Sequence, residues 1–185
     1  VYATEPTCDL LTYMLPDSGY IQESEVERLN RRNARRGRPE VTPIYTREDA
    51  ENTLLQLKKV EYHHWINVFD GVRARFWDAG HLLGSASIEI EVDDAAQQGK
   101  PTRLLFSGDV GTGEAVFNAA PEAPKDIDYL FVETTYGDRI RRDIDDEERR
   151  TLLATEVRDA LKAGGNLVIP SFAVARTQEI GRAHV

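Results

Sequence analysis

The spacing of apolar residues changes twice along the chain. After Thr46, the residues Ala50, Leu54 and Leu57 recur three or four positions apart up to Glu61, which predicts a capped amphipathic helix with one buried face. From residue 72 the period falls to two. Apolar and charged or aromatic residues then alternate over two runs, with the apolar positions at Val72, Ala74, Phe76, Ile88, Ile90 and Val92. This alternation predicts two half-buried strands.

Two further strands are predicted downstream, at 103–106 and 127–133. Residues 93–101 are typical of a hairpin connection into the third strand. Residues 79–86, between the first two strands, contain two glycines and several small residues, which suit a tight loop where backbone approaches a site. His81 lies in the middle of this loop.

A separate α/β unit is indicated beyond Gly137. A charged stretch at 138–148 leads into a predicted helix that Gly164 and Gly165 end. The apolar face of this helix consists of Leu152, Leu153, Val157, Ala160 and Leu161. Residues 166–170 then predict a short buried strand, and the order strand, helix, strand without an antiparallel turn is typical of an α/β unit.

The last five residues, 181–185, break the helical periodicity that precedes them. The string from Ile180 to Val185 is what a common sequencing adapter encodes in one reading frame. We therefore interpret 181–185 as a non-native tail and exclude His184 as a ligand.

Length and composition indicate a soluble globular protein. The chain has 185 residues, 41% of them hydrophobic, enough for one ordinary domain or parts of two with a real core. No apolar run approaches the roughly 20 residues of a membrane-spanning helix, so we expect no membrane partner. A single cysteine, Cys8, excludes an internal disulfide and fits a reducing, cytoplasmic location, and a buried side chain is a better interpretation of it than a catalytic thiol.

Charge argues against a diffuse basic surface for nucleic acid. There are 32 acidic residues against 23 Lys plus Arg, which gives a net charge of -9. The negative net charge does not exclude phosphodiester hydrolysis, because metal ions in a carboxylate-lined site supply positive charge where the phosphate binds. The one strongly basic stretch, 28–38, could contact an RNA backbone or form a solvated helix end and loop, and the second interpretation is the commoner one for like-charge blocks.

Three candidate chemical groups each follow a predicted strand: His81, Asp109 and Glu133. Zinc takes imidazole and carboxylate ligands at about 2.0–2.2 Å, so His81 and Asp109 are of the right type. Taken singly, each has a plain structural alternative. His81 could be a structural histidine, Asp109 an Asx-turn residue, and Glu133 a strand-end carboxylate facing water. His63 and His64, predicted on a polar helix end, point to different faces and are assigned no function.

The strings around the candidates resemble those of the β-CASP family of metallo-β-lactamase-fold RNA-processing nucleases. Gly80-His81-Leu82-Leu83-Gly84-Ser85-Ala86 resembles the family's third ligand motif, and Ser107-Gly108-Asp109 resembles the fourth. Glu133-Thr134-Thr135-Tyr136-Gly137-Asp138-Arg139 resembles the first β-CASP motif, with a glutamate as in the cleavage and polyadenylation endonuclease-like branch. Weaker similarities at 2–7 and 170–179 extend the resemblance over nearly the whole chain.

The resemblance implies an α/β fold: a partial metallo-β-lactamase αββα sandwich at 1–136, lacking its N-terminal part, and the start of an inserted β-CASP domain at 137–180. It implies that His81 binds one of two zinc ions and that Asp109 bridges both. It also implies a catalytic Glu133, which orients a downstream histidine that protonates the leaving oxygen. The family's upstream His-x-His-x-Asp-His cluster and its downstream histidines are not in this sequence.

The resulting hypothesis is a metal-dependent phosphodiester hydrolase acting on RNA, as an endo- or exoribonuclease, in the intact parent. RNA is the expected substrate, and a homodimer or a larger processing complex is the expected association. The 185 residues alone are expected to be inactive, because two ligands cannot hold a zinc pair. One alternative is a small-ester or thioester hydrolase of the same fold, which would lack the glutamate motif. Another is a non-catalytic β-CASP scaffold subunit, which retention of all three candidates disfavours.

Overall fold

A computed structural model of the chain describes residues 1–93, 99–113, 119–140, 145–172, 174 and 177–178. The chain divides into two compact units, Val1–Glu133 and Thr134–Val185. The assignment of 1–136 to a partial metallo-β-lactamase domain and of 137–180 to a β-CASP domain stays a prediction. The predicted tail at 181–185, with His184, lies outside the described residues.

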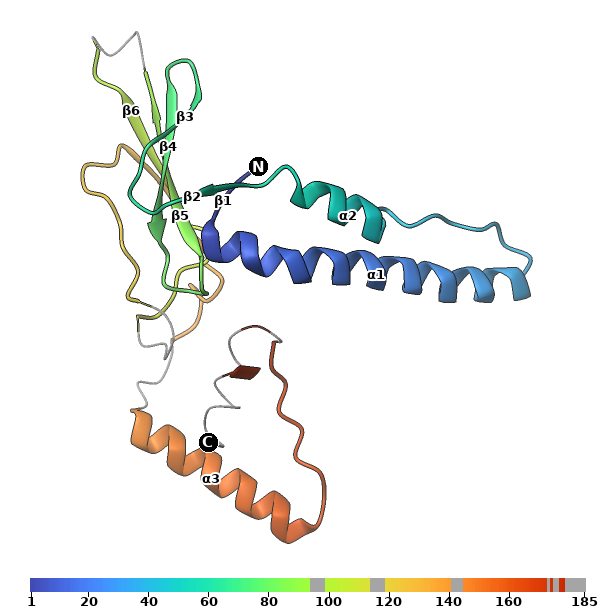
Figure 1. The fold of residues 1–185 in the computed structure, drawn as a ribbon. Coiled ribbons are helices and arrows are strands. Elements are labelled where there is room, and N and C mark those ends of the chain that lie inside the picture. Colours follow the sequence, from blue (N-terminus) through green and yellow to red (C-terminus); the bar gives the residue numbers. More distant parts are fainter. Residues whose placement is uncertain (94–98, 114–118, 141–144, 173, 175–176, 179–185) are drawn as a thin grey trace. The chain divides into compact units, whose positions relative to one another are not determined.

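The first unit begins with a short strand and a long helix. Strand β1 (Tyr2–Thr4) leads into α1 (Glu5–Arg35), along which α2 (Arg47–Leu54) lies (Figure 1). A glycine permits this packing, because a Cβ on Gly19 would lie 2.6 Å from the Cα of Arg47. The Ser18 and Tyr45 hydroxyls, 2.5 Å apart, join the same two segments. Cys8 of α1 is buried, as expected for a structural side chain.

The predicted helix after Thr46 is confirmed at its start and wrong at its end. The Asp49 amide donates to Thr46 Oγ1 at 3.1 Å, and the Thr46 amide donates to Asp49 Oδ2 at 2.9 Å, which forms a capping box. The helix ends at Leu54 rather than continuing to Glu61. The chain leaves the helix there because β2 (Lys58–Val60) pairs in parallel with β1.

The remaining strands of this unit form one sheet in the order β3-β4-β5-β6-β7 within the described residues. Their bounds are Ile66–Phe69, Val72–Asp78, Ala86–Val92, Thr102–Phe106 and Tyr129–Phe131. Neighbours are antiparallel except β6 and β7, which are parallel. The four predicted strands and the α/β class are confirmed, although β7 is shorter than the predicted 127–133.

The central strand β5 buries its polar face more deeply than its apolar face, whereas on β4 the apolar residues Ala74 and Phe76 are the buried ones. Along β5, the residues Ser87, Glu89 and Glu91 are buried, whereas the apolar residues between them are only half-buried. The carboxylate of Glu89 accepts hydrogen bonds from Arg75 on β4 and Arg103 on β6. Long side chains from both neighbouring strands therefore cover this face.

The second unit contains α3 (Asp146–Ala163), whose predicted position and glycine stop are confirmed. The Glu148 amide donates to Asp145 Oδ1 at 2.7 Å at its start, and Gly164 at φ +70° ends it. The predicted buried strand at 166–170 is wrong. These residues are exposed and form no strand, because no strand among the described residues of this unit offers backbone partners. None of the helices in the described part of the chain is long and apolar enough to cross a membrane.

Candidate active site

Three loops leave the sheet at the same end. The register pairs Asp78 at the end of β4 with Ala86 at the start of β5, and Phe106 with Phe131 at the ends of β6 and β7. The loops that follow β4, β6 and β7 carry the three sequence candidates His81, Asp109 and Glu133. The strand order thus gathers these loops at one edge, although each comes from a distant part of the sequence.

The His81 loop and the Asp109 loop contact each other through backbone. The amide of Gly111 donates to the carbonyl of Ala79 at 2.8 Å. A Cβ on Gly111 would lie 1.8 Å from the Gly80 carbonyl oxygen and 2.7 Å from the His81 nitrogen. Only glycine fits such an approach, so residue 111 sets the distance between the two loops.

Internal hydrogen bonds fix the His81 loop. Ser85 Oγ accepts from the amides of His81 and Leu82 at 3.0 and 3.1 Å, and the Ser85 amide donates to the Leu82 carbonyl at 2.9 Å. Asp78 Oδ1 accepts from the Gly80 amide at 2.8 Å, and Gly80 has φ +64°. The loop presents His81 as an exposed residue on a constrained turn.

The start of α1 supports the other side of this loop. Thr4 Oγ1 and Thr7 Oγ1 donate to the Gly84 carbonyl at 2.7 and 2.9 Å. Gly84 has φ +86°, and a Cβ there would lie 2.7 Å from the Thr7 amide nitrogen. The segment 2–7, which bears only a weak resemblance in sequence, is therefore part of the loop's support.

Tyr62 adds a further contact, since its hydroxyl donates to the Ser85 carbonyl at 2.9 Å. Burial, and to a smaller extent the charges of Asp78 and Glu122, raise the pKa of Tyr62 above its usual value of 10.0, so the phenol stays protonated as a donor. A hydrogen bond with Thr4 opposes this rise only in part.

Glu133 holds the Asp109 loop. Its Oε1 accepts from the Val110 amide at 2.9 Å, and its own amide donates to Ser107 Oγ at 3.0 Å. The Ser107 amide in turn donates to the Phe131 carbonyl at 2.9 Å. Sequence reasoning found Glu133 by its motif but gave no sign of this contact, which fixes the backbone next to Asp109.

The prediction that His63 and His64 lie on a helix end is wrong. They follow β2 in an irregular segment where Tyr62 bridges to Phe76. His63 Nε2 lies 2.5 Å from Glu122 Oε2, whereas His64 Nδ1 lies 3.4 Å from Glu61 Oε2.

The His63 contact bears on the site because Glu122 adjoins the His81 loop. The Glu122 amide donates to the Asp78 carbonyl at 2.8 Å, directly before that loop. The ring of His63 packs against Trp77 with centroids 5.0 Å apart. His63 is thus part of the support of the loop, a role that only the long-range contact with Glu122 reveals.

A metal site is incomplete in the described part of the chain. It contains no group of three or more His, Cys, Asp or Glu side chains that could hold a metal ion. His81 and Asp109 are donors of the type that zinc prefers, and they lie on touching loops, but a catalytic zinc needs three protein ligands or more. Their role as ligands stays a prediction.

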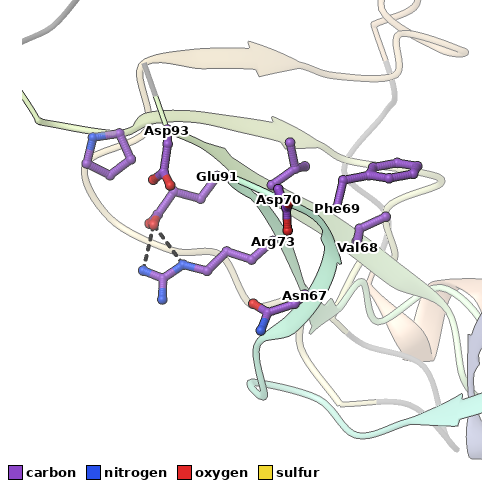
Figure 2. Close-up of a pocket in the computed structure, with 10 residues that line it drawn as sticks. Asn67, Val68, Phe69, Asp70, Arg73, Glu91 and Asp93 are labelled. Atoms are coloured by element: carbon purple, nitrogen blue, oxygen red, sulfur yellow. Dashed lines mark hydrogen bonds and ion pairs between the residues drawn. The ribbon is translucent and has the colours of Figure 1, made fainter. Parts of the chain in front are cut away.

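A groove at the opposite end of the sheet carries no comparable chemistry. It has a volume of about 770 Å³ and is lined by the β3–β4 turn and the ends of β4 and β5, including Asn67, Asp70, Arg73, Glu91 and Asp93 (Figure 2). Arg73 Nη2 and Glu91 Oε1 pair within it at 2.5 Å, as the dashed lines in Figure 2 show. The described residues that line it include neither histidine nor cysteine, and we assign it no function.

The sheet with its strand-end loops is consistent with part of the metallo-β-lactamase fold. No protein-family model matches the chain. Individual relatives do. The chain is 32% identical to an RNase J-like protein of Methanocaldococcus jannaschii over 97% of the chain and 37% of that protein. It is 32% identical to ribonuclease TTHA0252 of Thermus thermophilus, over 97% of the chain and 35% of the relative.

A third relative is cleavage and polyadenylation specificity factor subunit 3 of Dictyostelium discoideum, which is 25% identical over 97% of the chain and 20% of its own length. These relatives are proteins of the β-CASP family of the metallo-β-lactamase fold, so the chain is similar to that family over 97% of its length. The chain spans little more than a third of the length of the first two relatives and a fifth of the length of the third.

Proposed function

We propose that the chain is part of a zinc-dependent phosphodiester hydrolase that acts on RNA. The observation that carries this proposal is the meeting of the His81, Asp109 and Glu133 loops at one end of the sheet. Relatives named as ribonucleases align over 97% of the chain, and so include all three loops within the matched region.

In this proposal His81 and Asp109 would be among the residues that hold the two zinc ions of the intact enzyme. Zinc bound there would supply a Lewis acid for the phosphoryl oxygens and an activated water. Glu133 holds the Val110 amide through Oε1, which keeps the Asp109 backbone in position. It also serves as the carboxylate that orients a proton donor from a later part of the protein.

The surrounding contacts give this site its rigidity. Thr4 and Thr7 hold the Gly84 carbonyl, and Gly111 binds the Ala79 carbonyl. Ligands on loops that are fixed from several sides keep their geometry without reorganisation when charge develops on the substrate. We further propose that the protein acts in the cytoplasm, as a homodimer or within a larger processing complex. Sedimentation of the full-length protein tests its association state.

The test is cleavage of end-labelled single-stranded RNA by the full-length protein, together with metal content measured by mass spectrometry. We expect zinc-dependent cleavage that a chelator abolishes. His81→Ala and Asp109→Asn should each lose zinc and reduce cleavage to background, because each removes a proposed ligand.

A matched control is His64→Ala, which removes an exposed histidine whose Nδ1 contacts Glu61 and the Tyr62 carbonyl. It should leave zinc content and cleavage unchanged. Wild-type cleavage by His81→Ala would contradict the proposal, as would hydrolysis of a small thioester without any cleavage of RNA. The 185 residues alone are expected to cleave nothing, since they supply two of the ligands at most.

A further inference from the structure

The C-terminal end of α1 and the residues just after it carry the one strongly basic stretch of a sequence whose net charge is -9. Between residues 28 and 38 there are six arginines and no acidic residue. All six are exposed. We refer to Arg28, Arg31, Arg32, Arg35, Arg36 and Arg38 as the basic end of α1.

Helix stability does not account for this concentration of charge. Arginines in the last turn, here Arg32 and Arg35, interact favourably with the helix dipole, but that effect falls off within one turn. Arg28 lies before the last turn, and Arg38 lies beyond the helix. Within the described residues, the one salt bridge of the basic end joins Arg31 to Glu27 at 3.7 Å, and both side chains are more than 60% exposed, so it contributes little.

The fold holds this surface in a defined shape. The side chain of Asn30 donates to the Val41 carbonyl at 2.8 Å and accepts from the Val41 amide at 2.9 Å. Asn33 Nδ2 donates to the Pro39 carbonyl at 3.1 Å, and the Asn33 carbonyl accepts from the amides of Arg36 and Arg38. The chain beyond the helix is therefore fastened back against one side of α1.

The arginines lie on the other side. Arg28, Arg31 and Arg35 are spaced three and four residues apart and so share one face of the helix, whereas Asn33, on a different face, is buried. Three guanidinium groups along about 10 Å of helix form a row. Each can bind a phosphate through two parallel N–H groups.

We propose that the basic end of α1 binds the phosphates of single-stranded RNA at a distance from the site of cleavage. This inference rests on the proposed function, since it takes RNA as the substrate. A bilayer is a poorer ligand for the basic end, because membrane binding needs an apolar face beside the charges and between 28 and 38 the only large apolar residue is Leu29. The other strongly exposed apolar side chains of α1, Tyr13, Met14, Tyr20 and Ile21, lie seven or more residues before Arg28. The acidic character of the chain elsewhere confines RNA contact to such positive surfaces.

The structure also sets how long the RNA must be. The start of α1 contacts the His81 loop through Thr4, and Arg28 lies 24 residues further along a helix of 31 residues. At about 1.5 Å per residue this is about 36 Å, or about 10 nucleotides at roughly 3.4 Å for each phosphate of a stacked strand. A short RNA in the site cannot reach the basic end of α1, whereas a long one can.

The experiment measures the affinity of the full-length protein for labelled single-stranded RNAs, one well above and one well below this length, at several salt concentrations. The variant is the triple substitution Arg28→Gln, Arg31→Gln and Arg35→Gln, all at exposed positions. The control removes three exposed positive charges from the same unit but outside the basic end of α1, by Lys58→Gln, Lys100→Gln and Lys125→Gln.

We expect the arginine variant to bind the long RNA about 10 to 100 times more weakly near 0.1 M salt. The slope of log affinity against log salt should fall by about 2, because each phosphate contact to a single strand contributes roughly 0.7. Affinity for the short RNA and its cleavage should not change. Triple replacement by lysine should restore most of the salt slope, because it restores the charge.

The inference is overturned if the arginine variant keeps the affinity and the salt slope of the wild type, or if the lysine control loses as much. It is also overturned if the variant keeps RNA binding but loses binding to phosphatidylserine vesicles or to an acidic protein. A wild-type protein that cleaves no RNA, yet binds long RNA with an arginine-dependent salt slope, contradicts the proposed function and supports this inference.

Discussion

Removing the carboxylate of Glu89 should destabilise the sheet by about 3–5 kcal/mol, the cost of breaking a buried ion pair. Glu89 has no exposed surface. Its Oε2 accepts from Arg75 Nη2 and from Trp77 Nε1, both at 2.8 Å, and its Oε1 accepts from Arg103 Nε at 2.9 Å. In Glu89→Ala, two guanidiniums that are only 19% and 20% exposed lose their counter-charge.

Glu91→Ala is the matched comparison. Glu91 lies two residues further along the same face and pairs with Arg73, whose side chain is 45% exposed. Water can replace the lost carboxylate there, so the expected cost is about 1 kcal/mol. Native-state hydrogen exchange of the β4, β5 and β6 amides in the full-length protein measures both costs.

If Glu89→Ala does not fold, a second variant keeps the reasoning testable. Replacing the whole network by Arg75→Met, Glu89→Leu and Arg103→Met removes the charges together, and it should recover most of the lost stability or exceed that of the wild type. The reasoning is refuted if Glu89→Ala costs no more than Glu91→Ala.

The same network predicts a dependence on pH. Burial raises the pKa of Glu89, but the hydrogen bonds from Arg103, Trp77 and Arg75 outweigh it and hold the pKa below its ordinary value of 4.5. Glu89 therefore contributes stability that is present above about pH 4.5 and is lost as the pH falls through the folded-state value. In Glu89→Gln this part of the acid sensitivity should be absent from hydrogen exchange measured between pH 3 and 6.

Two predictions concern the loops of the candidate site. Gly111→Ala places a Cβ 1.8 Å from the Gly80 carbonyl oxygen; it should separate the two loops and lower zinc content as far as His81→Ala does. Unchanged zinc content would show that the loops need not touch. Glu133→Gln keeps an acceptor for the Val110 amide, so it should retain zinc while reducing cleavage, whereas Glu133→Ala should reduce both. Equal zinc loss in the two Glu133 variants would show that zinc binding needs the negative charge of Glu133.

The strands could be predicted because their signal is local. The period of two across β4 and β5 shows up in seven-residue runs, and no distant contact is needed to recognise it. The deep burial of a charged residue such as Glu89 on β5 is not local information. Glu89 is buried because Arg75 and Arg103 reach it from strands 14 residues away on either side.

The long helix α1 was not predictable from apolar spacing. Its buried residues are Cys8, Gly19 and Asn33, which are small or polar and form no apolar stripe. Pro16 lies inside it, where proline normally ends a helix. Conversely, residues 166–170 have the apolar character of a strand but form none, because a strand depends on a partner that the residues around it do not supply.

The same division between local and distant information explains what was missed at the site. The candidates His81, Asp109 and Glu133 stand out because each follows a strand in a specific string. The contacts that hold them do not, since Thr4 reaches Gly84 across 80 residues and Glu133 reaches Val110 across 23. The positions of the proposed ligands therefore depend on residues such as Thr4 and Gly84, which are not themselves proposed as ligands. Substitutions at these supports should weaken metal binding through loop geometry, so loss of activity alone does not identify a ligand in this protein.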